Sequence, residues 1–261
     1  LVAELIRGTR VSGLLGPFRK MPPANVAALE SVLLRVSEMV CELPWITELD
    51  INPLILDEND AVAVDARIVV GEYTPVPGRY DHMAIHPYPA DLVSTWQSMT
   101  GETVTLRPIR PEDAEIEQAF VRGLSAQSRY SRFMDVLREL TPRMLARFTQ
   151  IDYDREMALI ATVGRDGVEV ELGVCRYVIN PDGDSCEFAI AIADDQQGRG
   201  LGRHMMAQLI AVARARGLQT MIGHVRGDNH DMLNLCQSLG FVIAENPQDP
   251  VLKCVTLALG D

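Results

Sequence analysis

Residues 197–202, Gln-Gly-Arg-Gly-Leu-Gly, are the segment of this 261-residue sequence that points most directly to chemistry. The segment follows a strand-like run over 186–194 and opens a stretch with helical periodicity. Glycines allow the backbone to approach an anion closely, and a helix that begins there directs free N–H groups and the positive end of its dipole at that anion. The sequence therefore predicts a phosphate or pyrophosphate cradle. A glycine-rich turn without a ligand is the alternative.

The glycine spacing excludes two common phosphate loops. A dinucleotide-binding fold uses G-x-G-x-x-G, and a P-loop ends in G-K-[ST]. Here the glycines run G-x-G-x-G, and Arg203 follows the last of them. The flanking elements must therefore identify the anion. Arg199 and Arg203 either add positive charge beside it or are solvated arginines near the helix end.

Composition excludes several other classes of function. A net charge of −12 argues against general affinity for nucleic acid or anionic membranes, which requires a basic face. No continuous run of apolar residues approaches the length of a membrane span, which is about eighteen residues. The five cysteines are scattered, and His82 and His86 lie among prolines, so neither a disulfide framework nor a metal site is expected. We expect a reducing, cytoplasmic location.

The sequence divides into three regions. Residues 1–70 start at Leu1 within a helical pattern, which indicates a piece of a longer polypeptide. A helix over 26–40 follows, and then a hairpin whose strands are 45–56 and 61–70. Prolines at positions 75, 77, 87 and 89 interrupt any periodicity in residues 71–102, which are predicted to form an extended linker.

Residues 103–261 alternate strands and helices to the end. Helices are expected up to residue 150, over 200–215 and over 231–239, with Pro111 and Pro142 at favourable helix-start positions. The predicted strands are 103–107, 157–163, 171–179, 186–193, 220–225, 241–244 and 252–259. This order predicts a mixed α/β layer structure.

Residues 103–261 resemble the GNAT acyltransferase superfamily. Gln197, Gly200 and Gly202 match its acyl-CoA signature, [RQ]-x-x-G-x-[GA]. Further matching blocks occur in the family's order: Leu106-Arg107-Pro108 with Asp113, the run 188–192, and Asn229 with Leu239-Gly240-Phe241. The resemblance implies the GNAT fold and acetyl-CoA as co-substrate, with no metal required. The residues that it implies for acetyl-CoA binding are Ile190, Ile192, Gln197, Gly198, Arg199, Gly200, Leu201, Gly202, Arg203 and Asn229.

Residues 1–70 resemble the end of a different enzyme. The run 48–54 with Asp65 is similar to the hairpin that closes the ATP-grasp domain of NDP-forming acyl-CoA synthetases. In those enzymes the residues that match Asn52 and Asp65 hold Mg²⁺, a hard cation that prefers oxygen ligands. Most of an ATP-grasp domain has no counterpart in residues 1–70, so we do not expect ligase activity, and these two positions are vestigial metal candidates.

The combination of the two regions, with the stretches 83–89 and 148–153, resembles the bacterial Pat-type protein lysine acetyltransferases. These proteins join an idle acyl-CoA-synthetase-like region to a GNAT domain. The resemblance implies acetyl transfer to a lysine of a partner protein, often an acyl-CoA synthetase. Acetylation of a small amine or a protein N-terminus, and a non-catalytic acyl-CoA sensor, are the alternatives. The oligomeric state is not indicated.

Glu187 is the candidate general base, because a lysine ammonium must lose a proton before its nitrogen can attack a thioester. Period-two alternation puts Glu187 on one strand face with Ala189 and Ala191. With Cys186 and Phe188 beside it, we expect partial desolvation, which makes a carboxylate more basic. The resemblance also implies a base on this strand. A solvated glutamate or a salt-bridge partner is the alternative.

Several positions beyond the glycine segment have two interpretations. Asn229 either caps the helix that follows or contacts the cofactor, and Gly240 is expected to end that helix. Cys236 stands where many family members carry a tyrosine that protonates the departing thiolate, and we expect it to pack instead. Arg129, Arg132 and Asp154 lie where an acceptor groove is expected and either select substrates by charge or are solvated.

Overall fold

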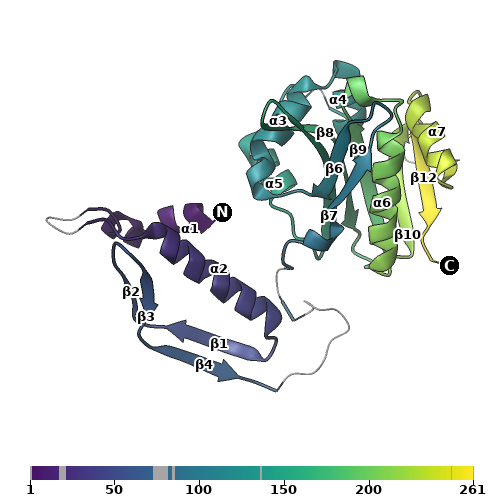
Figure 1. The fold of residues 1–261 in the computed structure, drawn as a ribbon. Helices are drawn as coiled ribbons and strands as arrows, with labels where there is room; N and C mark the ends of the chain where they lie inside the picture. Colours follow the sequence, from purple (N-terminus) through teal and green to yellow (C-terminus); the bar gives the residue numbers. More distant parts are fainter. Residues whose placement is uncertain are drawn as a thin grey trace. The chain divides into compact units, whose positions relative to one another are not determined.

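The computed structural model describes residues 2–17, 22–72, 82–83, 86–135, 137–247 and 249–260. The chain forms two compact units, Leu1–Pro87 and Tyr88–Asp261 (Figure 1). None of the helices in the described ranges is long and apolar enough to cross a membrane.

The first unit contains helices followed by a broken hairpin. Its helices are α1 (Val2–Arg7), the 3₁₀ helix η1 (Arg10–Leu14) and α2 (Val26–Glu42), and its strands are β1 (Ile46–Ile51), β2 (Leu54–Leu56), β3 (Ala61–Ala63) and β4 (Ala66–Val70). The outer strands β1 and β4 pair antiparallel, as do the inner strands β2 and β3. The predicted hairpin is confirmed, but each long strand is interrupted, one of them at Pro53, which lacks the N–H that a ladder needs.

The second unit is built on one eight-stranded sheet, which confirms the predicted mixed α/β class. Its strands follow the order β11-β12-β10-β9-β8-β7-β6-β5, and all neighbours are antiparallel except the pair β9 and β10. The strands are β5 (Ser94–Gln97), β6 (Thr103–Pro108), β7 (Glu156–Arg165), β8 (Val168–Ile179), β9 (Ser185–Ile192), β10 (Thr220–Arg226), β11 (Val242–Glu245) and β12 (Leu252–Ala258).

Helices cover both faces of this sheet (Figure 1). The α-helices are α3 (Ala114–Gly123), α4 (Ala126–Phe133), α5 (Pro142–Thr149), α6 (Leu201–Ala215) and α7 (His230–Ser238), and the 3₁₀ helices are η2 (Ala90–Leu92), η3 (Pro111–Asp113) and η4 (Asp194–Gln196). On one face, Met205 and Leu209 of α6 and Cys236 of α7 are fully buried in a single core. On the other face, Phe120 of α3 packs with Ala191 of β9 in a second core.

The predicted linker over 71–102 is too long at its C-terminal end. Strand β5 pairs with β6 at the edge of the large sheet, and Leu92 and Trp96 pack against the core beneath α6. All four prolines of the stretch lie before residue 90, so the sequence after Pro89 is free to form η2 and a strand. Residues 88–102 therefore belong to the second unit.

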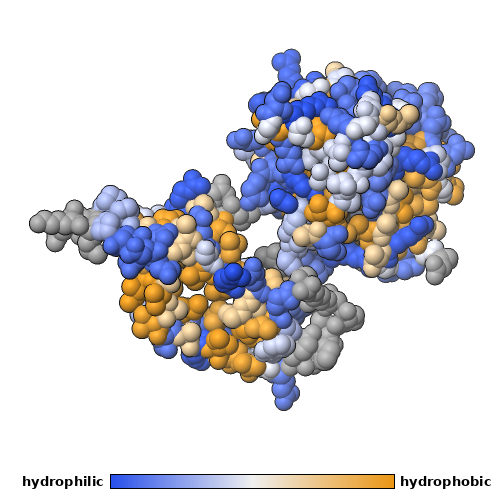
Figure 2. Space-filling model, viewed as in Figure 1, coloured by the Kyte–Doolittle hydropathy of each residue, from blue (hydrophilic) through white to orange (hydrophobic). Residues whose placement is uncertain are grey.

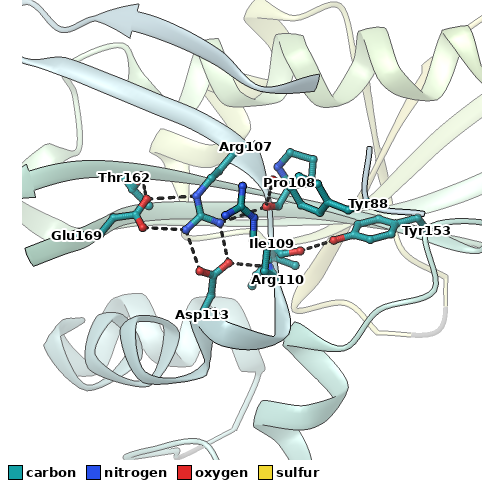
Figure 3. A network of polar contacts seen from close by, with 9 residues as sticks. All are labelled: Tyr88, Arg107, Pro108, Ile109, Arg110, Asp113, Tyr153, Thr162 and Glu169. Carbon is teal, nitrogen blue, oxygen red and sulfur yellow. Dashed lines mark hydrogen bonds and ion pairs between the residues drawn. The ribbon is translucent and has the colours of Figure 1, made fainter. Parts of the chain in front are cut away.

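A buried ion-pair network fixes the start of this unit (Figure 3). Arg107 Nη1 and Nη2 donate to the two carboxylate oxygens of Asp113 at 2.7 and 2.8 Å, and both side chains are about 5% exposed. Arg107 also donates to Glu169 on β8, which receives a further bond from Thr162. These hydrogen bonds, chiefly that from Arg107, lower the pKa of Glu169. The Arg107 and Asp113 motif is thus structural and ties β6 to η3 and β8.

Two tyrosines flank the same network (Figure 3). Tyr88 Oη donates to Pro108 O at 3.1 Å, and Tyr153 Oη donates to Ile109 O. Their rings pack edge to face with centroids 6.0 Å apart. Tyr88 and Tyr153 come from the stretches 83–89 and 148–153, so the sequence features typical of Pat-type proteins meet at the end of β6.

Candidate functional site

Strands β9 and β10 separate along their length, and this opening defines the candidate site. They are paired only through Thr220–Ser185, Met221–Cys186 and Ile222–Glu187. Beyond those pairs β9 continues to Ile192 and β10 to Arg226. Among the strand pairs that the structure describes, residues 189–192 thus have no strand partner on the β10 side. Their backbone edge is available to a ligand that can pair like a strand.

The glycine segment lies between the end of β9 and the start of α6, as predicted. Gly198 and Gly200 have φ values of 71° and 87°, a conformation that L side chains rarely adopt. Gly202 lies in the first turn of α6, where an added Cβ would lie 3.5 Å from Ile192 Cγ1. The first two glycines therefore permit the turn, and the third keeps the helix start close to β9. The first N–H groups of this 15-residue helix point into the turn.

Gln197 and Asp194 fasten this loop to α4. Gln197 Nε2 donates to Ile192 O at 3.0 Å and to Ser128 Oγ at 3.2 Å. Asp194 accepts bonds of 2.7 Å from the backbone and hydroxyl of Ser125 and from Ser128 Oγ. Burial opposes the charged form of Asp194, but these bonds outweigh it and lower its pKa. The amide of Gln197 thus orders the loop, and Asp194 is a supporting residue that the sequence did not reveal.

The two arginines of the segment differ in their surroundings. Arg199 is exposed within the loop. Arg203 donates to Ser238 Oγ at 2.8 Å and to Ser238 O at 3.3 Å, at the carboxyl end of α7. A cation is favourable at that helix end. Arg203 therefore links α6 to α7, and Arg199 is the better placed of the two to face an anion.

An aromatic pair lies beside the glycine segment. Trp96 of β5 stacks on His204 in the first turn of α6, with ring centroids 5.3 Å apart and an interplanar angle of 15°. A Cβ added at Gly200 would lie 3.9 Å from Trp96 Cζ2. Burial lowers the pKa of His204. Sequence analysis missed this contact because it assigned Trp96 to the linker.

The predicted desolvation of Glu187 is wrong, because its side chain is exposed. Cys186 and Phe188, which were expected to cover it, are buried in the core beneath α6, on the opposite sheet face. The alternation that separates these faces is the physical reason, since neighbours in a strand point away from each other. Glu187 instead lies on the face that carries α3 and Ala191, at a part of β9 open to solvent.

Three β10 side chains lie on the same sheet face as Glu187, beside the gap between β9 and β10. Met221 and Val225 are buried beneath α6, so Ile222, His224 and Arg226 lie on the other face. His224 is exposed, and its Nδ1 lies 3.5 Å from Asn246 Nδ2.

Arg226 connects β10 to α4. Its guanidinium lies 5.0 Å from the Tyr130 ring centroid and forms an ion pair with Asp228 at 2.5 Å. Helix α4 is therefore attached to the ends of both separating strands, through Asp194 after β9 and through Arg226 on β10.

The candidate acceptor residues Arg129, Arg132 and Asp154 have structural partners. Arg129 donates to Leu124 O and Arg122 O at the end of α3. Arg132 lies 5.0 Å from the Phe133 ring, and its pKa falls to about 10, chiefly through burial and also through repulsion from Arg176. Asp154 pairs with Arg216 at 3.0 Å. The two arginines are thus partly buried and held by contacts within the domain.

Three positions around α7 behave as structural residues. Asn229 Oδ1 accepts from Met232 N at 3.2 Å, which confirms the helix cap. Gly240 has a φ of 89° after the helix end, as expected of a C-terminal glycine. Cys236 is fully buried, and burial raises its thiol pKa to about 11. Cys236 is therefore a packing residue.

Asn52 and Asp65 are brought together in the first unit. Asn52 N donates to Asp65 O at 3.1 Å, and both side chains are exposed. Among the residues that the structure describes, no group of three or more His, Cys, Asp or Glu side chains is placed to hold a metal ion.

Family models match both parts of this chain. The model described as acetyltransferase (GNAT) domain matches residues 103–242, and an ATP-grasp domain model matches residues 1–70. The first match covers more than half of the sequence. The chain therefore belongs to the GNAT acetyltransferase family and is an N-acetyltransferase, with an ATP-grasp segment ahead of the GNAT domain.

Individual relatives identify the nearer group. An acetyltransferase of Pseudomonas aeruginosa is 40% identical over 159 residues, covering 61% of this chain and 86% of that protein. The acetyltransferase Pat of Mycolicibacterium smegmatis is 29% identical over 250 residues, covering 85% of this chain and 72% of that protein. The solved GNAT domain of S. lividans PAT is 27% identical with a TM-score of 0.61, covering 66% of this chain and 99% of that domain. The chain is thus close to Pat-type acetyltransferases.

The N-terminal segment has its own relatives. The beta subunit of an ADP-forming acetate–CoA ligase of Pyrococcus furiosus is 40% identical over 67 residues, which are 26% of this chain and 29% of that subunit. The resemblance of this segment to acyl-CoA synthetases is confirmed, and it spans a minor part of the ligase subunit.

Proposed function

We propose that this chain transfers the acetyl group of acetyl-CoA to the side-chain amine of a protein lysine, with an acyl-CoA synthetase as the acceptor class. The observation that carries the proposal is the separation of β9 from β10 immediately beyond the Ile222–Glu187 pair. It leaves an unpaired strand edge that leads from Glu187 to the glycine cradle. A long donor with an amide-bearing arm and a pyrophosphate suits that path.

The residues present fit acetyl-CoA in two places. The edge at Ile190 and Ile192 has no strand partner on the β10 side and offers backbone groups to the amides of the pantetheine arm. The turn at 198–202 offers N–H groups of the α6 N-terminus to the pyrophosphate, with Arg199 exposed beside it. Leu201 and Gln197 hold the loop through burial and hydrogen bonds. We assign Asn229 to helix capping first, because its side-chain oxygen is already occupied.

Glu187 is the proposed base for the acceptor amine. Lysine has an ordinary pKa of about 10.4, so its ammonium must lose a proton before attack. Glu187 is exposed on the open face of β9, where it can accept that proton directly or through water. The neutral nitrogen then attacks the thioester carbonyl, the C–N bond forms, and the C–S bond breaks. Cys236 is buried with a raised pKa, so we expect the thiolate to leave without help from it.

The protein acceptor is supported by two features. The part of β9 that carries Glu187 is exposed to solvent, which suits a lysine presented on a protein surface. The ATP-grasp segment and the GNAT domain occur together in one chain, and the match to Pat extends over 250 residues. We assign catalysis to residues 88–261 and a non-catalytic role to residues 1–70, with Asn52 and Asp65 as remnants of a metal site. Five free cysteines suit a reducing cytoplasm.

The decisive experiment offers labelled acetyl-CoA to the purified chain with an acyl-CoA synthetase, polyamines and free amino acids. We expect label on a synthetase lysine, located by mass spectrometry. Label confined to a polyamine or an amino acid would replace the protein acceptor with a small one. Tight acetyl-CoA binding without transfer to any amine would indicate a sensor.

Two variants test the assigned site. Glu187→Gln should keep acetyl-CoA affinity but lower kcat by about 10²- to 10⁴-fold, the usual contribution of a general base. Gly200→Asp should abolish acetyl-CoA binding, because a side chain and a negative charge enter the cradle. Gly183→Asp is its control, since Gly183 has a similar φ of 76° and open space around it. Equal affinities for the two glycine variants would refute the cradle.

A further inference from the structure

We propose that His224 is a second proton-handling side chain of the acceptor site, acting together with Glu187 on the acceptor nitrogen. The proposal rests on the proposed transfer of acetyl to an amine. Glu187 alone accounts for only one of the two protons that leave the acceptor nitrogen.

The chemistry requires two proton transfers from one nitrogen. An ammonium group carries three N–H bonds and the product amide carries one, so two protons leave. One proton must leave before the C–N bond forms, and the other leaves as the C–S bond breaks. The departing CoA thiolate takes up one proton to become a thiol, and the other is released to solvent. A single carboxylate holds only one proton at a time, so a second acceptor near the nitrogen allows both transfers without waiting for exchange with bulk water.

His224 occupies the position that this role requires. Ile222 is the last β10 residue paired with β9, and its partner is Glu187. His224 is the next residue on that face, at the point where the strands separate. His224 is therefore offset by two residues from the position opposite Glu187, on the same face of this parallel pair. An amine nitrogen that enters between them can reach Glu187 on one side and His224, directly or through one water, on the other.

The groups around His224 come from its own strand and from the strands on either side of it. On its strand the nearest charge is Arg226, which is neutralised by its ion pair with Asp228. Across β12 the register partner is Cys254, and Asn246 lies 3.5 Å from Nδ1. Glu187 of β9 lies on the same face, opposite Ile222. Imidazole is the side chain whose ordinary pKa, about 6.5, lies closest to neutrality, so it can both accept and release a proton.

His224→Gln in the full chain tests the proposal, with His230→Gln as the matched control. His230 is an exposed histidine at the first residue of α7. We expect His224→Gln to keep acetyl-CoA affinity and the acceptor KM while kcat falls at least tenfold, and added imidazole to restore part of the loss. Imidazole rescue is the readout that a merely structural role would not produce. The control should keep its kcat within twofold and show no rescue.

The outcomes separate this proposal from the proposed function. A His224→Gln kcat within twofold of the control, while Glu187→Gln shows its expected loss of kcat, would overturn the role of His224 and leave lysine acetylation standing. A tenfold loss that imidazole does not relieve, with raised acceptor KM, would also overturn it and assign His224 to acceptor binding. Failure of the unaltered chain to acetylate any protein lysine would instead refute the proposed function.

Discussion

The two units of this chain differ most in how far they bury their apolar side chains. Among the described residues of the first unit, Ile6 alone is buried, and apolar residues such as Leu34, Val62 and Val70 are more than half exposed. Figure 2 shows this apolar surface over α2 and the strands of the first unit. The second unit buries two separate cores against its eight-stranded sheet. The first unit matches an ATP-grasp domain model, and the 67 residues shared with a ligase subunit are 29% of that subunit.

The difference shows that the two units have different sources of stability. A domain needs enough chain to enclose a core, and segments of about 70 residues rarely achieve this without additional support. The 174 residues of the second unit contain their own cores, their own ion-pair network and the whole candidate site. We therefore expect the second unit to fold without the first, because it contains its own cores.

The largest expected effect follows from separating the two units. Expressed alone, residues 88–261 should unfold cooperatively in urea and bind acetyl-CoA within a few-fold of the full chain. Residues 1–72 should show no cooperative transition, because their burial is too small to offset chain entropy. Circular dichroism and fluorescence during urea titration measure both. A sharp transition in the 1–72 fragment would contradict the comparison, as would a second-unit fragment that fails to fold.

Local sequence patterns predicted the elements of the second unit because their signals are local. The glycines at 198 and 200 require special backbone conformations, Asn229 and Gly240 mark helix ends, and Pro142 marks a helix start. Each signal depends on residues within one or two turns. The strands and helices that carry the cradle were placed correctly for this reason.

Contacts between distant segments could not be predicted in the same way. Asp194 binds Ser125 across 69 positions, and Trp96 stacks on His204 across more than 100. No periodicity links such residues, and nearby prolines concealed the strand that carries Trp96. The exposure of Glu187 was missed for another reason, since its sequence neighbours were treated as spatial neighbours although a strand separates them onto opposite faces.

The next effect compares a buried with an exposed ion pair. Arg107→Ala should destabilise the second unit by about 3–5 kcal/mol, because Asp113 would remain buried without its partner. Arg122→Ala, in the same unit, should cost less than about 1 kcal/mol, since Arg122 and Glu139 are 2.6 Å apart and their side chains are 59% and 58% exposed. Urea unfolding of the full chain at neutral pH measures both losses. Similar losses for the two variants would show that burial does not separate these pairs.

The smallest expected effect is the difference between a buried and an exposed glutamate in how they make stability depend on pH. Glu171 of β8 and Glu117 of α3 are 4% and 2% exposed and lie close together in the second unit. Burial first, and then repulsion by Glu117, raises the pKa of Glu171 well above 4.5. Its protonated form therefore stabilises the fold fully below about pH 4.5, and that contribution is lost as the pH rises through the folded-state pKa.

Glu171→Gln should remove this loss, because an amide keeps the shape of the protonated carboxyl and cannot ionise. We expect the variant to match the unaltered chain below pH 4.5 and to exceed its stability at alkaline pH by on the order of 1–3 kcal/mol, the cost of one poorly satisfied buried polar group. Glu115→Gln, at an exposed position of α3 in the same unit, should show no comparable dependence on pH across this range. Urea midpoints from pH 4 to 9 measure the difference. A gain that is the same at every pH would mean that packing, rather than ionisation, distinguishes the two carboxyl groups.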